Sequence, residues 1–272
     1  MSARVDLVVR VATVVALLGV VASVGVAEAK RAPATHVVVG PGVYRPMFPV
    51  APAEATVAVS RFKFDVEPVT NAQFLAFVRS QPRWRRDVVS GLFVDAHYLS
   101  HWGEPLALGA ARPNQPVTRV SWFAAKAYCE ARGQRLPTER EWEFAAAASP
   151  TSIDGNVDPT WRATVLGWYE RGGGPLADVG GAANIWGVRD LHGLVWEWVY
   201  DFGAALVALD SREKSDGDTK RFCGAGAALA ADSTDYATFM RLAYRSSLEA
   251  SYSTRNLGFR CAADVPASKG AR

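Results

Sequence analysis

Three cysteines, Cys129, Cys223 and Cys261, are the residues of this chain whose chemistry depends most on pairing. A thiolate is a nucleophile and a soft metal ligand, whereas two oxidised cysteines form a structural cross-link. An odd number leaves at least one thiol without a partner in the same chain. Cys223 opens the stretch CGAGAALAADSTDYATFM at 223–240. Three interpretations remain open for it: a working thiol, half of a disulfide, or a residue without a chemical role.

Two histidines form the next candidate for metal chemistry. His97 and His101 lie four residues apart in DAHYLSHW, the spacing that places two imidazoles on one helical face, and Asp95 is close by. Pro105 and the mixed polar pattern around it do not indicate a helix. We therefore favour a loop with two incidental histidines over a metal site.

A pair of carboxylates could bind a hard metal ion. Asp190 and Glu197 are seven residues apart in DLHGLVWEW, and Gly193 between them permits a tight backbone turn. Carboxylate oxygens together with backbone carbonyls form the kind of site that suits Ca²⁺. From the residues alone we favour a buried, salt-bridged turn, and a calcium site is the alternative.

Helix-start signals indicate three helices that would position these groups. Thr70 caps a helix that begins NAQFLAFV, with apolar residues at helical spacing. Ser121 caps a second helix, WFAAKAYCEAR, which Gly133 ends. Thr138 and Glu141 form a capping box at the start of a third helix, because Pro137 prevents the second helix from continuing into it.

The remaining elements are less regular. Alternating apolar residues at 57–66 predict a strand, and the many prolines of 80–120 predict loops. Trp142 and Phe144 of the third helix should pack inward. Between 149 and 264 we find no long periodic pattern. The sequence therefore predicts a single α+β domain with much irregular structure.

Composition sets limits on the class of protein. Thirty basic and 27 acidic residues give a net charge of +3 without a Lys/Arg block, which does not indicate a nucleic-acid partner. The 49% hydrophobic content and nine tryptophans can fill a sizeable core. We expect a signal peptide at 1–29, an extended segment at 30–56, one domain at 57–264 and a frayed tail at 265–272.

The N-terminal residues have the pattern of an export signal. Arg4 and Arg10 precede an apolar run at 11–26, and the small residues AEA end it before Lys30. This pattern predicts a cleaved secretory signal peptide. An uncleaved anchor is the alternative, although the run is shorter than the roughly 20 residues that span a bilayer. We expect a protein of the bacterial periplasm, or a secreted one, with no membrane contact after cleavage.

Four ordered segments resemble the sulfatase-modifying-factor family, whose best-known member is the formylglycine-generating enzyme. They are PVTNAQFLAFV at 68–78, QPVTRVSWFAAKAYCEARGQRLPTEREWEFAAAA at 115–148, NIWGVRDLHGLVWEW at 184–198 and NLGFRCAAD at 256–264. The resemblance implies a compact α+β fold related to C-type lectins and poor in regular structure.

The resemblance also implies two structural features. One is a calcium ion held by Asp190 and Glu197 and by the backbone carbonyls of Gly193 and Val195. The other is a disulfide that joins the second helix to the last strand. Its partners would be the cysteines of the AYC and GFRC segments, Cys129 and Cys261.

The family's catalytic pattern is incomplete in this chain. Members that make formylglycine use two cysteines five residues apart, which bind Cu(I) and activate oxygen to oxidise a substrate cysteine. Arg241 and Arg245 match the arginines that follow that pair, but AALAADSTDYATFM at 227–240 contains no cysteine. Because Cu(I) prefers soft thiolates, we expect no copper here, and Cys223 is the odd thiol beside the altered site. Related ergothioneine-pathway enzymes use a three-histidine iron site, and we leave iron open.

If the family's cleft persists, a set of polar and aromatic residues should line it; an aromatic-packed surface loop is the alternative. The expected function is that of an exported accessory or binding protein, acting in enzyme maturation or toxin immunity on a protein partner or a peptide-derived substrate. The alternative is an oxidoreductase with an altered metal site. The residues expected in the cleft are Asp232, Asp235, Tyr236, Arg241, Tyr244, Arg245 and Tyr252.

Overall fold

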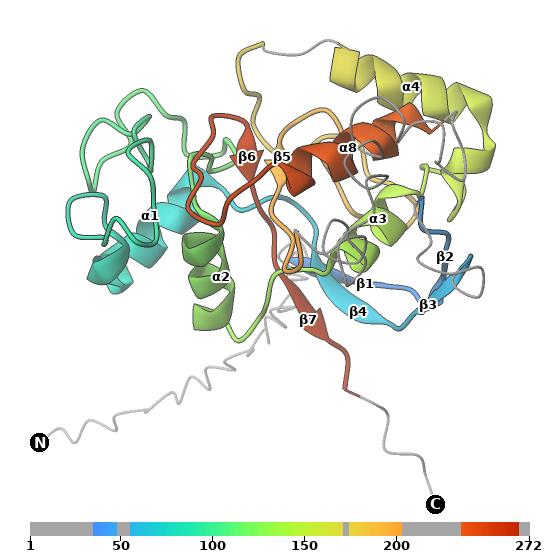
Figure 1. Ribbon diagram of the computed structural model, residues 1–272, viewed down its shortest axis with the longest axis horizontal. Coiled ribbons are helices and arrows are strands. Elements are labelled where there is room, and N and C mark those ends of the chain that lie inside the picture. Colours follow the sequence, from blue (N-terminus) through green and yellow to red (C-terminus); the bar gives the residue numbers. More distant parts are fainter. Residues whose placement is uncertain (1–34, 48–54, 171–173, 203–234, 267–272) are drawn as a thin grey trace, which may run out of the picture. The chain divides into compact units, whose positions relative to one another are not determined.

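Short antiparallel strands form a three-stranded sheet in the computed structural model, which describes residues 35–47, 55–170, 174–202 and 235–266 (Figure 1). Strands β1 (His36–Val39), β4 (Phe62–Asp65) and β7 (Ala262–Asp264) pair in the order β1-β4-β7. Phe62 and Phe64, two residues apart, share a face of β4 and are both buried. The sheet thus presents an apolar face to the core.

Two smaller sheets complete the strand content of the described residues. Strand β2 (Gly42–Tyr44) pairs antiparallel with β3 (Val57–Val59), and β5 (Trp196–Glu197) pairs parallel with β6 (Leu257–Gly258). The prediction of a single strand at 57–66 is therefore wrong in one respect. This segment forms two strands, β3 and β4, which belong to different sheets.

The three predicted helices are confirmed with their caps. Helix α1 (Asn71–Ser80) begins after Thr70, α2 (Trp122–Ala131) after Ser121, and α3 (Glu139–Ala146) after Thr138. Each cap side chain accepts a hydrogen bond from a backbone N–H of the first turn, which stabilises a helix by about 1 kcal/mol. Gly133 has φ +68°, the left-handed conformation expected just beyond the end of α2.

Within the described residues, two further helices lie where no periodic pattern was found. They are α4 (Pro159–Glu170) and α8 (Tyr236–Ser246), and Asp235 caps α8 by accepting a bond from the Thr238 N–H. The buried face of α8 includes Arg241 and Arg245, so it lacks the apolar stripe that reveals a helix in sequence. The 3₁₀ turns η2 (Pro82–Trp84) and η3 (Gly155–Val157) lie in loop regions.

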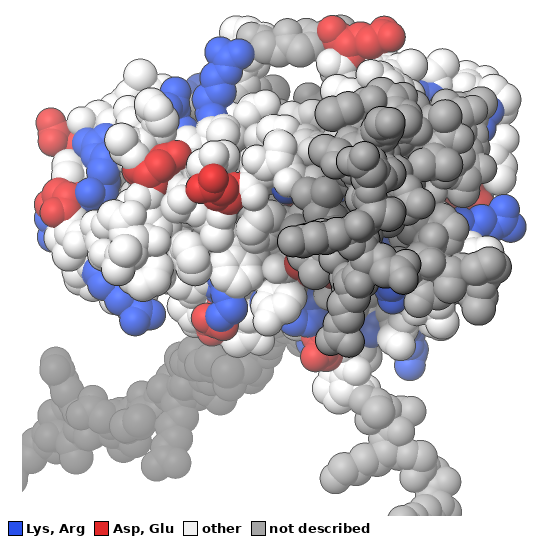
Figure 2. Space-filling model, viewed as in Figure 1, with Lys and Arg blue, Asp and Glu red and all other residues white. Residues whose placement is uncertain are grey.

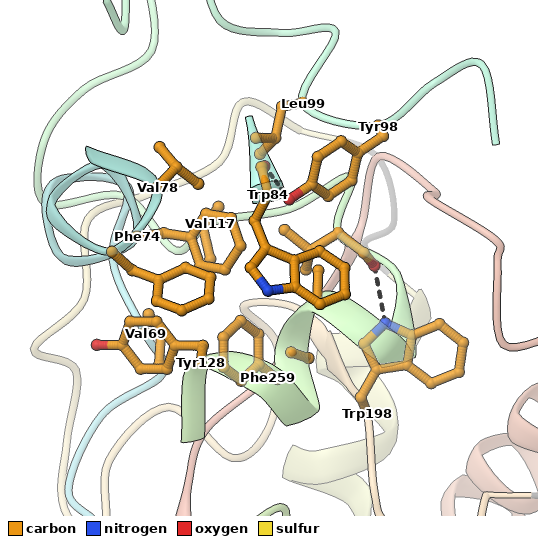
Figure 3. Close-up of a cluster of buried hydrophobic side chains, with 14 of the residues drawn as sticks. Val69, Phe74, Val78, Trp84, Tyr98, Leu99, Val117, Tyr128, Trp198 and Phe259 are labelled. Carbon is orange, nitrogen blue, oxygen red and sulfur yellow. Dashed lines mark hydrogen bonds between the residues drawn. The ribbon is translucent and has the colours of Figure 1, made fainter. Parts of the chain in front are cut away.

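An aromatic cluster joins α1, α2 and the last strands (Figure 3). The Phe74 ring lies 5.8 Å from the Tyr128 ring and 6.0 Å from the Phe259 ring, measured between centroids. The Trp198 indole donates to the Val120 carbonyl at 2.9 Å, so this buried polar atom is satisfied. A second cluster packs Trp142 and Phe144 of α3 against the β1–β4 face, which confirms that both side chains point inward.

A disulfide fixes α2 to the strand region. Cys129 and Cys261 are bonded, the pairing that the resemblance implied, and 132 positions separate them in sequence. On the chain-entropy model a loop of this length stabilises the fold by about 5 kcal/mol. No helix in the part of the chain that the structure describes is both long and apolar enough to cross a membrane. The predicted signal peptide at 1–29 lies outside that part.

Candidate functional site

Helix α8 lies beside α3 (Figure 1). Two arginines of α8 contact one glutamate of α3. Arg241 Nη2 lies 2.7 Å from Glu143 Oε2, and Arg245 Nη1 lies 2.6 Å from Glu143 Oε1. All three residues are at least 97% buried. Burial alone would raise the pKa of Glu143, but the two guanidinium groups outweigh it and hold that pKa below its ordinary value.

A chain of hydrogen bonds extends from Arg241 to the backbone of α3. Arg241 Nη1 donates to the Tyr169 hydroxyl at 3.3 Å, and that oxygen lies 3.4 Å from His192 Nδ1. His192 Nε2 lies 2.9 Å from the Ala146 carbonyl, which can only accept, so we assign the ring proton to Nε2. Tyr169 then donates to Nδ1. Every step of this chain has a donor and an acceptor.

His192 is a fixed neutral group in this arrangement. Its ring stacks on Trp168 at 5.7 Å between centroids and meets the Trp142 ring edge-on. Burial, together with the nearby Arg241 charge, lowers its pKa to about 3. Because both ring nitrogens are engaged, His192 positions Tyr169 rather than transferring protons near neutral pH.

A pocket of about 240 Å³ lies between α4, η3 and the start of α8. Of the buried cluster formed by Glu143, Arg241 and Arg245, Arg241 alone lines this pocket. Asp235 and Tyr236, at the start of α8, line it as well. Asp235 also accepts a 3.4 Å bond from Asn156 Nδ2. A larger cavity of about 880 Å³ shares three of the lining residues with this pocket, namely Asn156, Arg162 and Asp235. We call the two together the α8 cleft.

The structure brings together part of the predicted cleft set. Asp235, Tyr236 and Arg241 border the α8 cleft. Tyr244 instead packs on Trp196, and its hydroxyl lies 2.9 Å from the Thr254 hydroxyl. Arg245 is buried on Glu143, and the linings of these two cavities do not include it, Tyr244 or Tyr252, so their place in a binding cleft stays a prediction. Asp232 and Cys223 lie outside the described residues.

Several residues of the cleft were not predicted from sequence. They come from η3, α4 and the 190s loop, segments that carried no strong helical signal. Arg241 and Arg245 lie four residues apart, the spacing of one helical face, and this was the only signal that pointed to their common partner. The cleft residues missed are Asn156, Arg162 and His192. Tyr169, which accepts from Arg241, and the pairing role of Glu143 were also missed.

The two carboxylates expected to bind calcium have other partners. Both oxygens of Glu197 accept bonds from Arg260, at 2.8 to 3.1 Å, and Oε2 also accepts one from the Trp142 indole at 2.6 Å. These four contacts use the lone-pair directions of the carboxylate, and the guanidinium repels a divalent cation. Asp190 instead accepts bonds from the Gly180 and Gly181 N–H groups, at 2.8 and 2.9 Å. The residues as arranged do not fit a calcium ion, and we derive nothing from one.

The histidine pair lies in a loop, as favoured from sequence. Residues 95–105 form turns, and His101 Nε2 lies 3.2 Å from Asn71 Oδ1. Burial, with repulsion from Arg119 and Arg86, lowers the pKa of His101 to about 4. Asp95 accepts bonds from the His97 and Ser253 N–H groups and so shapes the loop. The described residues contain no group of three His, Cys, Asp or Glu side chains arranged to hold a metal ion.

Glu139 is a further titratable group beside the buried cluster. Its Oε2 is buried without a hydrogen-bond partner, while its backbone N–H donates to Asp201 at 2.7 Å. Burial raises the pKa of Glu139 to about 7; the Arg245 and Arg140 charges oppose this rise, and the Glu143 and Asp201 charges add to it. The carboxyl group is therefore partly protonated near neutral pH.

This combination of short strands, irregular loops and a charged cleft defines an α+β fold of the formylglycine-generating-enzyme type, as predicted. The model of the sulfatase-modifying factor enzyme 1-like domain matches residues 22–265, so the chain belongs to this family. The match begins well before residue 57, where the sequence motifs placed the start of the domain.

Relatives with different activities match this chain. The formylglycine-generating enzyme of Streptomyces coelicolor is 32% identical over 260 residues, covering 79% of this chain and 82% of that protein. An inactive C-alpha-formylglycine-generating enzyme 2 of Bos taurus is 29% identical over 253 residues, covering 76% and 78%. The hercynine oxygenase of Mycolicibacterium thermoresistibile is 32% identical over 160 residues, covering 52% of this chain and 36% of that protein. The family thus includes oxygenases and inactive members.

Two solved structures are similar in outline. PvdO from Pseudomonas aeruginosa has a TM-score of 0.46 and 19% identity, and covers 85% of this chain and 94% of its own. CarF has a TM-score of 0.47 and 16% identity, and covers 85% and 98%.

Proposed function

We propose that this chain does not make formylglycine by the two-thiol copper route and that it acts as an exported binding or accessory protein. The observation that carries the proposal is which of its cysteines are bonded to each other. The sequence has three, and Cys129 and Cys261 are joined to each other. Only Cys223 is left, so one chain cannot supply two thiolates to a copper ion while the disulfide is intact.

The α8 cleft supports a binding role. Arg241 is held by Glu143, Tyr169 and Thr238, so its charge is positioned before any ligand arrives. Asp235 places an opposite charge on the same pocket. Charges of both signs at a small pocket suit a peptide segment or a peptide-derived molecule. We propose that a periplasmic enzyme or a toxin supplies it.

Two observations support export. The disulfide favours an oxidising compartment, because cytosolic thiols are kept reduced. The pattern at 1–29 is that of a signal peptide.

Figure 2 shows Lys, Arg, Asp and Glu side chains scattered over the face in view, with uncharged surface between them. This mixture agrees with a protein or peptide partner and not with a nucleic acid.

The test uses the full mature chain next to the Streptomyces coelicolor enzyme as a positive control. Each is supplied with Cu(I) and a cysteine-bearing sulfatase peptide, and oxygen consumption and metal content are measured. We expect turnover only in the control. Oxygen-dependent turnover with stoichiometric copper or iron in this chain would instead establish the altered oxidoreductase and refute the binding role.

A further inference from the structure

A second concave surface lies between α2 and the segment from η2 to Phe93. It has a volume of about 560 Å³, within the range of ligand and anchor pockets. Trp84, Val88, Val89 and Phe93 line one wall, and α2 supplies the other. We call it the α2 groove. The residues that α2 contributes are Trp122, Phe123, Lys126, Ala127 and Glu130.

The aromatic walls of the α2 groove are fixed in place. The Trp122 indole donates to the Val199 carbonyl at 3.0 Å. The Phe93 ring meets the Phe123 ring edge-on at 5.3 Å and lies 6.0 Å from the Trp84 ring. Trp84 itself is buried in the aromatic cluster, where Tyr98 donates to its carbonyl (Figure 3). A ligand would therefore meet a preorganised surface and lose little entropy in ordering it.

Large apolar side chains are exposed in and next to the loop wall. Val88 and Phe93, which line the groove, are 54% and 42% exposed, and Leu92, beside Phe93 in sequence, is 81% exposed. Beyond the groove, Tyr200 is half exposed and its ring lies 6.0 Å from Trp122. Adjacent exposed aromatic and aliphatic side chains around a pocket are typical of interaction surfaces, where aromatic anchors supply most of the binding free energy.

The charged side chains that line the α2 groove are Arg83, Lys126 and Glu130, two basic and one acidic. On the facing helix, Lys126 pairs with Glu130. Arg83 lines the groove and lies over the Trp84 ring at 5.8 Å, and no carboxylate among the described residues pairs with it. An exposed guanidinium next to aromatic rings complements a carboxylate.

We propose that the α2 groove docks an acidic segment of a partner protein. An aromatic or aliphatic side chain of that segment packs against Phe93 and Phe123, and a neighbouring carboxylate pairs with Arg83. The groove shares no lining residue with the α8 cleft. Docking here can therefore hold whether or not the function proposed for the cleft is correct.

The first experiment selects peptides on the full mature chain from a displayed library of random dodecapeptides. Selected peptides are then synthesised with a fluorescent label, and binding is measured by anisotropy. We expect the selected sequences to share an aromatic or large aliphatic residue next to Asp or Glu. Absence of that pattern would overturn the proposal.

Variants locate the binding surface. Arg83→Glu and Phe93→Ser should each weaken binding of the selected peptide at least tenfold, the loss expected of an interface hot spot. Arg255→Glu and Ile185→Ser are matched controls, because both side chains are exposed and lie outside the groove. Equal binding by all four variants would refute the assignment to the groove. Circular dichroism of each variant separates lost docking from lost folding.

Competition distinguishes an acidic protein segment from other anionic surfaces. A poly-dT oligonucleotide and vesicles containing phosphatidylserine are added to the complex of chain and peptide. We expect neither to displace the peptide at physiological salt. If either one displaces the peptide, and if its own binding is lost in Arg83→Glu, the groove binds a nucleic acid or a membrane surface and the proposal is overturned.

Discussion

The buried carboxylate of Glu143 should be among the most sensitive positions in the chain. It accepts bonds from both Arg241 and Arg245, and all three side chains are almost completely excluded from water. Replacing it with glutamine keeps its shape but leaves two buried cations without a counter-charge. Breaking one buried ion pair costs about 3–5 kcal/mol, so we expect Glu143→Gln to lose about 5 kcal/mol of unfolding free energy.

Urea unfolding at pH 7 measures this loss, and the melting temperature should fall by about 10 to 20 °C. Glu130→Gln is the matched control, because its pair with Lys126 is exposed and contributes about 0.5 kcal/mol or less. Replacing Glu143, Arg241 and Arg245 together with methionine should recover much of the loss, since no unpaired charge stays buried. If Glu143→Gln cost no more than Glu130→Gln, the reasoning from the buried cluster would be refuted.

The pH dependence follows from the same pair. The pKa of Glu143 is held below its ordinary value of 4.5, so its stabilising contribution is complete above pH 4.5. That contribution is lost as the pH falls through the lower pKa of the folded state. The wild-type chain should therefore lose stability in this acidic range, while Glu143→Gln should lose less.

Further predictions concern the other groups around the core. Burial raises the pKa of Glu139 to about 7, so the folded state favours its protonated form, and stability should fall as the pH rises from 4.5 through 7. Glu139→Gln should remove that decline. In urea unfolding at pH 8 it should stabilise the chain by about 2 kcal/mol. Replacing both Cys129 and Cys261 with serine should cost about 5 kcal/mol, and an unchanged denaturation midpoint would contradict the cross-link. Removing metal with EDTA and then adding Ca²⁺ should change the melting temperature by no more than about 1 °C, because Glu197 is held by Arg260. A rise of several degrees on adding Ca²⁺ would instead support calcium binding by the ligands that the resemblance implied.

The parts of the fold that sequence predicted are those with local causes. Thr70, Ser121 and Thr138 were identifiable because a cap side chain and the backbone N–H that donates to it lie within one turn of each other. The start of α8 was missed although Asp235 caps it in the same way, because the helix buries arginines. Local polar signals predict helix ends well only when an apolar stripe accompanies them.

The candidate site depends on contacts that sequence does not encode locally. Arg241 and Glu143 are 98 residues apart, and Arg260 and Glu197 are 63 apart. A sequence motif identifies each carboxylate but not the cation that folding brings to it. This is why Arg245 was expected in the cleft and Glu197 at a metal, whereas both are used in buried ion pairs.

The most direct test of the proposed function is the fate of a substrate cysteine. The mature chain, its disulfide intact, is incubated with Cu(I), oxygen and a cysteine-bearing sulfatase peptide, and the peptide is analysed by mass spectrometry for formylglycine. With a single thiol left in the chain, the account predicts an unmodified peptide, and the same result for Cys223→Ser. Formylglycine that appears with the wild-type chain and disappears with Cys223→Ser would contradict it.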